Sequence, residues 1–464
     1  MTVRKGQIVE LDIEKMAVGG SGVARADGLV LFVKGAVAGD RVLAKVYKKK
    51  KDWAEARVTE IIDPSEDRIP APCPYSGYCG GCQWQQVRYD RQLAYKTALV
   101  EEAVRHIGGL PHVPVRDAIA SADIFGYRNK MEFSFSDRRW FLPREMSLKD
   151  AEGGFALGLH IPGTYNKVLD VDACLLQQDA GNGILNRVKR FARESSMAPY
   201  GVKTHEGFWR YLALRHSRAR DEWMVNVVTS DLEPEAVKPL VDRLVAGFGG
   251  IRTVVNNINR GRAAIAVGEA EEVLFGDGFI EDNIGPFSFR ISANSFFQTN
   301  TRGARRLYET VLSFADLSGG ETVADLYSGT GTIPIFLSRH VGEVTGFELS
   351  AGAVADARIN CRQNGIDNCR FVIGDIREKL AEAPHRPDVM IIDPPRAGMH
   401  KDAVAGVLAA RPRKIVYVSC NPATLARDLK IMCEDYHILE IQPVDMFPHT
   451  HHIEAVANLR RIGG

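Results

Sequence analysis

The sequence predicts an α/β protein in which a doubly wound parallel sheet follows a small β-barrel and an α+β region. Three patterns support this prediction. Residues 1–63 are short valine-rich segments separated by glycines. In the next region, 64–290, a cysteine-rich loop and a helical stretch from about residue 89 to 106 precede strand-like alternation over 120–290, and residues 291–464 alternate apolar strands with helices. A chain of 464 residues also exceeds what one compact core holds, so we expect three domains with these bounds.

The first 63 residues predict an OB-like β-barrel, because their valine-rich strands are interrupted by turns at the spacing of small barrels. Between Met1 and Lys51 there are eleven Lys and Arg against five Asp and Glu, and the stretch ends in four lysines, Lys48–Lys51. A local basic patch attracts phosphate, and small barrels commonly bind oligonucleotides. A solvated lysine loop is the alternative interpretation.

The sequence predicts a cytoplasmic chain. Its N-terminal residues, MTVRKGQIVE, lack the apolar segment of a signal peptide, and no apolar run approaches the length of a membrane span. The chain is 45% hydrophobic and 25% charged, which is ordinary for a soluble globular protein. We therefore expect no membrane partner.

Four of the eight cysteines indicate a ligand site. Cys73, Cys79 and Cys82 are crowded into the segment CPYSGYCGGCQWQQ, and Cys174 stands apart. In a reducing compartment a disulfide framework is not expected. Four thiolates can hold tetrahedral zinc or an iron–sulfur cluster. The spacing leaves zinc and iron–sulfur open, with buried free thiols as a minor alternative, and it favours a structural role.

The predicted parallel sheet is Rossmann-like, and its strands end in a glycine turn and a series of acids. The turn DLYSGTGT spans Asp325–Thr332, but it is not G-x-G-x-x-G and no Lys follows, which disfavours a nicotinamide or ATP site. Glu348, Asp375 and Asp393 end the next three strands, where Glu348 could hold ribose hydroxyls and Asp375 an adenine edge. Singly each acid is more typical of a helix cap. Together they resemble the S-adenosylmethionine-dependent methyltransferase class.

A cysteine directly follows the apolar strand IVYVS, within the segment SCNPAT at Ser419–Thr424. The Asn-Pro pair after Cys420 favours a turn that exposes the thiol. Carbon 5 of a pyrimidine is too weak a nucleophile to take a methyl group unaided. A thiolate added to carbon 6 activates it, which requires one positioned cysteine with a lowered pKa. A small apolar filler is the alternative role for Cys420.

The segment FPHTHHIE, at Phe447–Glu454, offers a general base, which is needed to remove the proton from carbon 5 after methyl transfer. Glu454 precedes the apolar run AVANL, the expected last strand, and burial there would raise its pKa. His449, His451 and His452 have no acid pair nearby in the sequence. We expect them to have structural or RNA-facing roles rather than to bind metal.

These motifs together resemble the RNA uracil-5 methyltransferase family, and most closely its 23S ribosomal RNA branch. The resemblance covers nearly the whole chain, since the family's motifs occur in order as FFQTN, DLYSGTGT, DPPRAG, SCNPAT and FPHTHHIE. It implies that residues 1–63 are a TRAM domain, an RNA-binding module. It also implies a [4Fe-4S] cluster on Cys73, Cys79, Cys82 and Cys174. The transfer-RNA branch typically lacks barrel and cluster, so ribosomal RNA is the expected substrate.

Carried over residue by residue, the resemblance implies Cys420 as the nucleophile and Glu454 as the base. The site for S-adenosylmethionine would be lined by Gln298, Tyr327, Thr332, Glu348, Asp375 and Asp393. Of these, Asp393 and Gln298 would also face the uracil, and Thr332 and Asp375 stand where related sequences often carry asparagine. Phe296 could stack on a base, with packing as the expected default. We expect the target uridine in a loop, with its base turned out of the stack.

Three other functions stay open. The substrate could be transfer RNA. A cytosine-5 RNA methyltransferase would use the same adduct, but those enzymes generally carry a cysteine beside a proline after the fourth strand, where this chain has Asp393-Pro394-Pro395-Arg396. A non-catalytic RNA-binding assembly factor would need only the barrel and the lysines. Whichever of these functions holds, we expect the protein to be a monomer.

Overall fold

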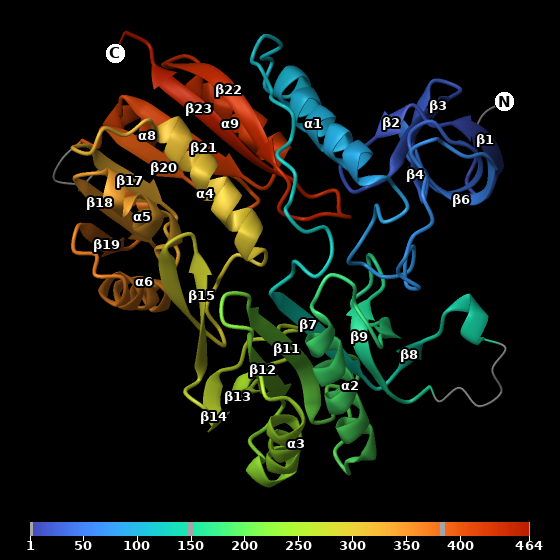
Figure 1. The fold of residues 1–464 in the computed structure, drawn as a ribbon. Coiled ribbons are helices and arrows are strands. Elements are labelled where there is room, and N and C mark those ends of the chain that lie inside the picture. The colour runs from blue at the N-terminus through green and yellow to red at the C-terminus, as the bar shows by residue number, and fades with distance from the viewer. Residues whose placement is uncertain (1–2, 147–152, 381–385, 464) are drawn as a thin grey trace.

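The computed structural model describes residues 3–146, 153–380 and 386–463. These residues form sheets of six, eight and seven strands and a separate two-stranded sheet. In Figure 1 the N-terminal barrel (blue) and the C-terminal sheet (orange to red) lie on either side of helix α1, with the eight-stranded sheet (mostly green) below them. The predicted fold class, an α/β domain with an N-terminal barrel and a central α+β region, is confirmed.

The N-terminal barrel is a six-stranded sheet in the order β1-β5-β6-β4-β3-β2. Alternate residues face its interior, where Leu31 and Val33 of one strand and Ala54 and Ala56 of another are fully buried. The small alanines suit the narrow space inside a small barrel. Its strands are β1 (Ile8–Asp12), β2 (Lys15–Met16), β3 (Gly22–Ala26), β4 (Leu29–Lys34), β5 (Arg41–Lys49) and β6 (Trp53–Asp63).

The central region is an eight-stranded sheet in the order β14-β13-β12-β11-β7-β9-β10-β8. The polar turn expected at 218–221 joins β11 to β12 as a hairpin. The expectation of an antiparallel sheet is only partly right, because β12 and β13 run parallel and are connected through α3. The elements are β7 (Lys130–Ser136), β8 (Arg139–Trp140), η1 (Pro143–Glu145), β9 (Ala156–His160), β10 (Val168–Asp170), α2 (Asp179–Glu194), β11 (Trp209–Ser217), β12 (Glu222–Thr229), α3 (Pro234–Gly247), β13 (Ile251–Ile258) and β14 (Ala270–Phe275).

The C-terminal sheet has the order β19-β18-β17-β20-β21-β23-β22, with its first five strands parallel and β23 antiparallel to both neighbours. The strand order reverses between β17 and β20, which is where doubly wound sheets bind ligands. The elements are α4 (Thr301–Ala315), β17 (Thr322–Leu326), α5 (Thr332–Leu337), η2 (Ser338–His340), β18 (Glu343–Glu348), α6 (Ala351–Gln363), β19 (Cys369–Ile373), α7 (Ile376–Lys379), β20 (Val389–Ile392), α8 (Lys401–Ala410), β21 (Lys414–Ser419), α9 (Pro422–Met432), β22 (Tyr436–Val444) and β23 (Glu454–Arg461).

A two-stranded hairpin, β15 (Phe279–Ile284) and β16 (Phe287–Ser292), leads into the C-terminal sheet. Phe287, Phe289 and Ile291 of β16 are buried in the core of that sheet, since alternate residues of a strand share one face. β16 therefore crosses the domain boundary expected at residue 290. The division into three domains stays a prediction.

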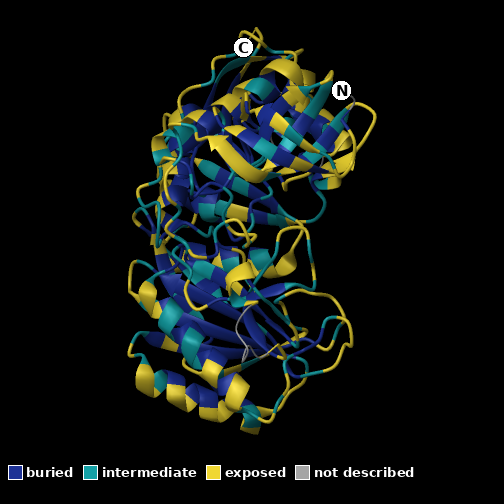
Figure 2. Ribbon diagram, turned by 90° about the vertical axis from the view of Figure 1, so that its right-hand side faces the viewer, coloured by how far each residue is buried: buried dark blue, intermediate teal, exposed yellow. Residues whose placement is uncertain are grey.

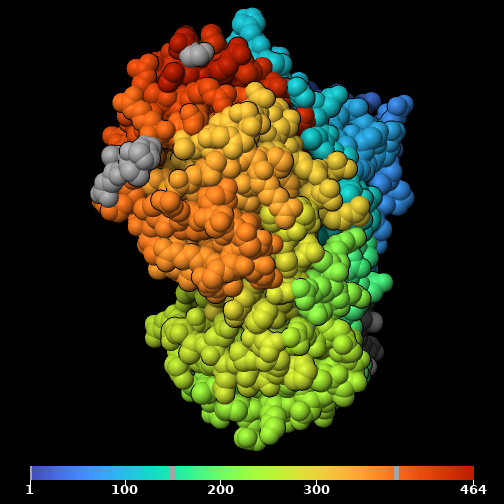
Figure 3. Space-filling model, turned by 60° about the vertical axis from the view of Figure 1, so that its left-hand side comes forward, coloured from blue at the N-terminus to red at the C-terminus, as the bar shows by residue number. Residues whose placement is uncertain are grey.

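Helix α1 (Tyr89–His106) joins the barrel to the C-terminal sheet. Val100 and Val104 pack into a core shared with that sheet, whereas Leu99 packs against Met16 of the barrel. Figure 2 shows buried strands in the interior and exposed residues mainly on helices and loops. In Figure 3 the central region forms a lobe of its own below the C-terminal domain. Within the described ranges, no helix has the length and apolar character needed to cross a membrane.

Candidate active site

Strands β21 and β23 bring Cys420 and Glu454 together. Ser419, the last residue of β21, pairs with Ala455 in an antiparallel register, so the next position along one strand is Cys420 and along the other is Glu454. Cys420 is half-buried and Glu454 is only 8% exposed. The thiol and the carboxyl group come from different sequence motifs, and the pairing of the two strands brings them into one site.

The backbone around Cys420 is fixed by the start of α9. Asn421 caps this helix, since its side-chain oxygen accepts a hydrogen bond from the N–H of Ala423 at 3.1 Å. Pro422 occupies the first helical turn, where its missing N–H costs nothing. The hydroxyl of Ser419 accepts a hydrogen bond from the N–H of Asn421 at 3.1 Å. The turn predicted from SCNPAT thus holds Cys420 between a strand end and a helix cap.

Burial governs the charge states of both groups. It raises the pKa of Cys420 to about 11, with the negative charge of Glu454 adding to the effect and Arg396 opposing it. The sequence predicted a lowered pKa for this thiol, whereas burial in the folded protein raises it. Burial also raises the pKa of Glu454 well above its usual value, as the sequence predicted, and Asp393 adds to this shift.

A cavity of about 140 Å³ opens in front of Cys420. Three separate parts of the chain line it: the barrel through Val18, helix α1 through Leu99, and the C-terminal sheet through Arg396 and His452. Val18 is 63% exposed, although it is apolar. The barrel consequently borders the reactive thiol rather than lying apart from it.

Arg396 is a site residue that the sequence reasoning did not single out, although it stands in the quoted DPPRAG motif. Its carbonyl accepts a hydrogen bond from the side-chain amide of Asn421 at 3.0 Å. Its guanidinium Nη2 lies 3.3 Å from Nδ1 of His452. The guanidinium lowers the pKa values of both Cys420 and Glu454 against the effect of burial, so it is the cation of this site.

The glycine turn after β17 forms the neighbouring part of the site. Tyr327 and Gly331 have left-handed backbone angles, with φ of 68° and 77°. A Cβ on Gly331 would lie 2.9 Å from the ring of Phe371, so only glycine fits there. The carboxylate of Glu348 accepts hydrogen bonds from the N–H groups of Gly329 at 3.0 Å and Ser350 at 2.8 Å. The end of β18 is thereby fastened to the glycine turn.

Several buried polar groups meet beside this turn. The hydroxyl of Tyr308, on α4, lies 2.8 Å from that of Thr332. Burial raises the pKa of Tyr308, and Asp393 and Asp325 add smaller contributions in the same direction. Burial raises the pKa of Asp393 to about 7. Tyr308, which the sequence did not single out, therefore contacts Thr332, one of the predicted donor-site residues.

These features agree with known proteins. Residues 265–386 and 383–462 match the family model described as tRNA (Uracil-5-)-methyltransferase, and residues 2–59 match the TRAM domain. An uncharacterized RNA methyltransferase of Chlorobaculum tepidum is 42% identical over 99% of this chain and 97% of its own. The chain belongs to the RNA uracil-5 methyltransferase family. It is an enzyme of S-adenosylmethionine-dependent RNA methylation, and its predicted family and TRAM domain are confirmed.

Two further relatives of this methyltransferase bear on its substrate. An uncharacterized RNA methyltransferase of Halalkalibacterium halodurans is 38% identical over 98% of both chains. The crystal structure of a Pyrococcus abyssi tRNA (uracil-54, C5)-methyltransferase with S-adenosyl-L-homocysteine has a TM-score of 0.76 and 30% identity, covering 97% of this chain and 99% of its own. Because that match includes the N-terminal region, the barrel does not separate ribosomal from transfer-RNA enzymes. The expectation that a barrel points to ribosomal RNA is therefore not supported by this match.

Asp375, an expected donor-site acid, is paired with a neighbouring arginine. It caps α7, accepting a hydrogen bond from the N–H of Arg377 at 2.9 Å, and both its oxygens face the Arg377 guanidinium. This pairing lowers the pKa of Asp375 to about 2. A contact between Asp375 and adenine stays a prediction.

The ring of Phe296 lies on the surface, although the sequence favoured packing in the interior. It is 68% exposed. Its carbonyl accepts a hydrogen bond from the hydroxyl of Thr330 at 3.4 Å, which keeps Phe296 next to the glycine turn. An exposed aromatic ring beside the site of an RNA methyltransferase is suited to stacking on a base.

Cys73, Cys79, Cys82 and Cys174 line one cavity of about 340 Å³ in the enzyme. Burial raises the pKa of Cys79 to about 11 and that of Cys82 to about 12. Over the described residues, no group of three or more His, Cys, Asp or Glu side chains has an arrangement that could hold a metal ion. The expected cluster is therefore not shown. Four cysteines around a cavity of this size are nevertheless a donor set that fits a thiolate-bound group.

Proposed function

We propose that this enzyme methylates carbon 5 of a uridine in 23S ribosomal RNA through a covalent adduct with Cys420. The observation that carries the proposal is the register of β21 and β23, which sets Cys420 opposite Glu454. A nucleophile and a base at adjacent strand positions can act on neighbouring carbons of one ring. RNA as the substrate class is supported by the TRAM match and the family match.

The proposed chemistry uses Cys420 first. After losing its proton to water, its sulfur forms a bond to carbon 6 of the uracil, and the electrons of the 5,6 double bond move toward oxygen 4 as an enolate. S-adenosylmethionine, when bound, would supply an electrophilic methyl group. As the 4-carbonyl of the uracil re-forms, carbon 5 would form a bond to that methyl carbon while the bond from the methyl carbon to the sulfonium sulfur breaks, leaving S-adenosylhomocysteine. Glu454 then takes the proton from carbon 5, the carbon–sulfur bond breaks, and the 5,6 double bond returns. A raised pKa makes the Glu454 carboxylate a stronger base for this step.

The other expected residues would bind and orient. We propose that Gln298, Tyr327, Thr332, Glu348, Asp375 and Asp393 line the methyl-donor site, with Asp393 and Gln298 also facing the uracil. Support comes from the common edge of the sheet: the carboxylate of Glu348 accepts a hydrogen bond from the glycine turn, and Thr332 opens the helix that follows that turn. A neutral carboxyl on Asp393 could donate a hydrogen bond to the enolate oxygen, since its pKa is about 7.

We also propose a [4Fe-4S] cluster on Cys73, Cys79, Cys82 and Cys174, with a structural role. The shared cavity supports this proposal, and the four thiols would supply the iron ligands. We further propose that the enzyme acts as a monomer in the cytoplasm. The target base would be turned out of its stack into the cavity that Cys420, Val18 and Arg396 line.

Transfer RNA is the second candidate substrate. The observation that favours it is the match, over 97% of this chain, to the structure of the Pyrococcus abyssi tRNA enzyme. Both candidates share the reaction and the site residues. They differ only in the RNA that the barrel and the exposed surface around Cys420 select.

A methylation assay tests the proposal. Purified protein is incubated with S-adenosylmethionine and, in separate reactions, unmodified 23S ribosomal RNA and unmodified transfer RNA, and the digested nucleosides are measured by mass spectrometry. We expect 5-methyluridine from 23S RNA and none with Cys420→Ala. Product from transfer RNA alone would establish the second candidate. 5-Methylcytidine would establish a cytosine enzyme, and no product from either RNA would leave the binding-factor function.

A further inference from the structure

We propose that helix α1 positions the general base, with Lys96 and Gln92 holding the loop from which Glu454 enters the site. This base-positioning loop comprises residues 445–453, between β22 and β23. The inference rests on the proposed role of Glu454. Lys96 and Gln92 are positioning residues, because they contact the loop and not the reacting groups.

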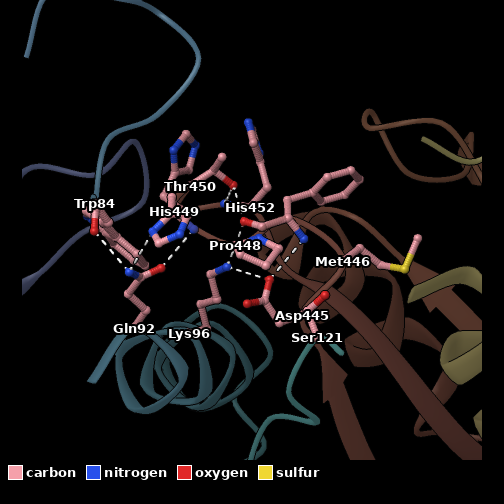
Figure 4. Close-up of polar contacts among 12 residues, drawn as sticks. Trp84, Gln92, Lys96, Ser121, Asp445, Met446, Pro448, His449, Thr450 and His452 are labelled. Atoms are coloured by element: carbon pink, nitrogen blue, oxygen red, sulfur yellow. Dashed lines mark hydrogen bonds and ion pairs between the residues drawn. The ribbon is translucent and has the colours of Figure 1, made fainter. Parts of the chain in front are cut away.

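Lys96 makes a fully buried ion pair with the first residue of the loop. Its Nζ lies 2.6 Å from Oδ1 of Asp445, and both side chains are 0% exposed (Figure 4). The same Nζ donates to the carbonyl of Phe447 at 3.0 Å, and the hydroxyl of Tyr89 donates to the other Asp445 oxygen at 3.0 Å. A buried charge pair is costly unless its hydrogen bonds are satisfied. Here α1 satisfies them through Tyr89 and Lys96, which lie two turns apart on the same face of the helix.

Gln92 holds the middle of the loop. Its side-chain oxygen accepts a hydrogen bond from the N–H of His449 at 2.8 Å, and its Nε2 lies 3.2 Å from Nδ1 of that histidine (Figure 4). His449 has a φ of 66°, which a residue with a side chain rarely adopts. The N–H groups of Gln83 and Trp84 donate to the His449 carbonyl at 3.0 and 2.9 Å. Contacts from α1 and the cysteine-rich segment thus keep the loop in one conformation.

The loop controls the base because its ends are next to it. Val444, the last residue of β22, pairs with Glu454, so Asp445 follows directly on the partner of the base. The other end carries His452, which faces Arg396. A shift of about 1 Å in a reacting group can lower a rate roughly 100-fold. Loss of the Lys96 contact should therefore slow proton removal more than RNA binding.

The test measures whether the covalent RNA–protein adduct accumulates. Accumulation distinguishes a misplaced base from a general loss of stability. Lys96→Met and Gln92→Leu are compared with Lys189→Met, which removes another buried lysine, paired with Asp170 at 2.9 Å in the central domain. We expect the first two to lower kcat roughly 10–100-fold with KM for RNA within about twofold. We also expect them to accumulate a denaturant-stable RNA–protein band, because elimination waits on Glu454. Lys189→Met should lose stability without accumulating the band.

Gln92→Leu keeps the inference testable if Lys96→Met does not fold, because it removes only neutral hydrogen bonds. Glu454→Gln, measured in parallel, distinguishes failure of the positioning role of α1 from failure of Glu454 as the base. A band from Glu454→Gln but none from folded Lys96→Met or Gln92→Leu, with kcat near the unsubstituted value, would overturn the role of α1 alone. No band from Glu454→Gln together with full turnover would overturn the proposed base and, with it, this inference.

Discussion

The hydroxyl of Tyr308 lies 2.8 Å from the hydroxyl of Thr332, and this contact joins α4 to the first residue of α5. Tyr308 is only 1% exposed, so its hydroxyl has no access to bulk water. The two hydroxyls therefore satisfy each other, and they fix the helix that begins at the glycine turn. An expected donor-site residue, Thr332, is oriented by a residue from a helix outside that turn.

Tyr308→Phe should weaken the site more than the fold. We expect a loss of about 1 kcal/mol in the free energy of unfolding, because the half-buried Thr332 hydroxyl loses its partner. We also expect S-adenosylmethionine to bind more weakly, measured by calorimetry. Tyr436→Phe is the matched control: its buried hydroxyl donates to the carbonyl of Pro412 at 2.9 Å, remote from the glycine turn. Equal loss of donor affinity in both variants would contradict the role of Tyr308.

Cys420→Ala should abolish turnover and leave the fold intact. No other group at the end of β21 can add to carbon 6, so we expect kcat to fall by at least about 10³-fold, measured by methyl transfer to RNA. Cys433→Ala is the control, because this thiol lies at the end of α9 and only donates to the carbonyl of Lys430 at 3.2 Å. Near-normal turnover in the Cys420 variant would exclude the covalent mechanism.

Asp325→Asn should change how stability depends on pH. Asp325 is 1% exposed, and neither of its oxygens has a hydrogen-bond partner among the residues that the structure describes. Burial raises its pKa well above the usual value. The folded protein therefore keeps a proton that the unfolded chain releases above about pH 4, so this group's contribution to stability is full below that pH and is lost as the pH rises. The stability of the Asn variant relative to the unsubstituted protein should rise from pH 4 to pH 8 in urea unfolding.

Asp375→Asn is the control of opposite sign. Arg377 lowers the pKa of Asp375 to about 2, so this carboxylate contributes stability above about pH 4 and loses it as the pH falls toward 2. The Asn variant should therefore be less stable than the unsubstituted protein at neutral pH, with the difference shrinking on acidification. Parallel pH curves for the two variants would contradict the assignment of either shift.

The sequence could predict which residues gather at the edge of the parallel sheet. Glu348 ends β18, Asp393 follows β20 and Cys420 follows β21. Because these strands are parallel members of one sheet, one topological rule brings all three residues to the same edge. Glu454 is different, because an apolar run reveals a strand but not its neighbours. β23 lies between β21 and β22 and is antiparallel to both, and this arrangement follows only from the folded sheet.

Other features depend on burial, which local sequence does not reveal. Lys96 lies in an ordinary amphipathic stretch, yet its side chain is fully buried because the loop after β22 packs on α1. Tyr308 has no motif of its own, and its importance comes from its contact with Thr332, which the fold brings to it from the start of another helix. The pKa of Cys420 was expected to be low from its chemistry, but it is high because the strand end is shielded from water.

The four cysteines allow a prediction about metal content. We expect protein purified without oxygen to be brown, with about four iron and four sulfide per chain, because four thiols line one cavity. Cys79→Ser should lose iron and colour, whereas Cys433→Ser, outside the cavity, should keep both. The measurement is iron and acid-labile sulfide analysis beside the visible spectrum. Since the spacing of the cysteines also suits zinc, a colourless protein with one zinc per chain, lost in Cys79→Ser, would replace the iron–sulfur assignment.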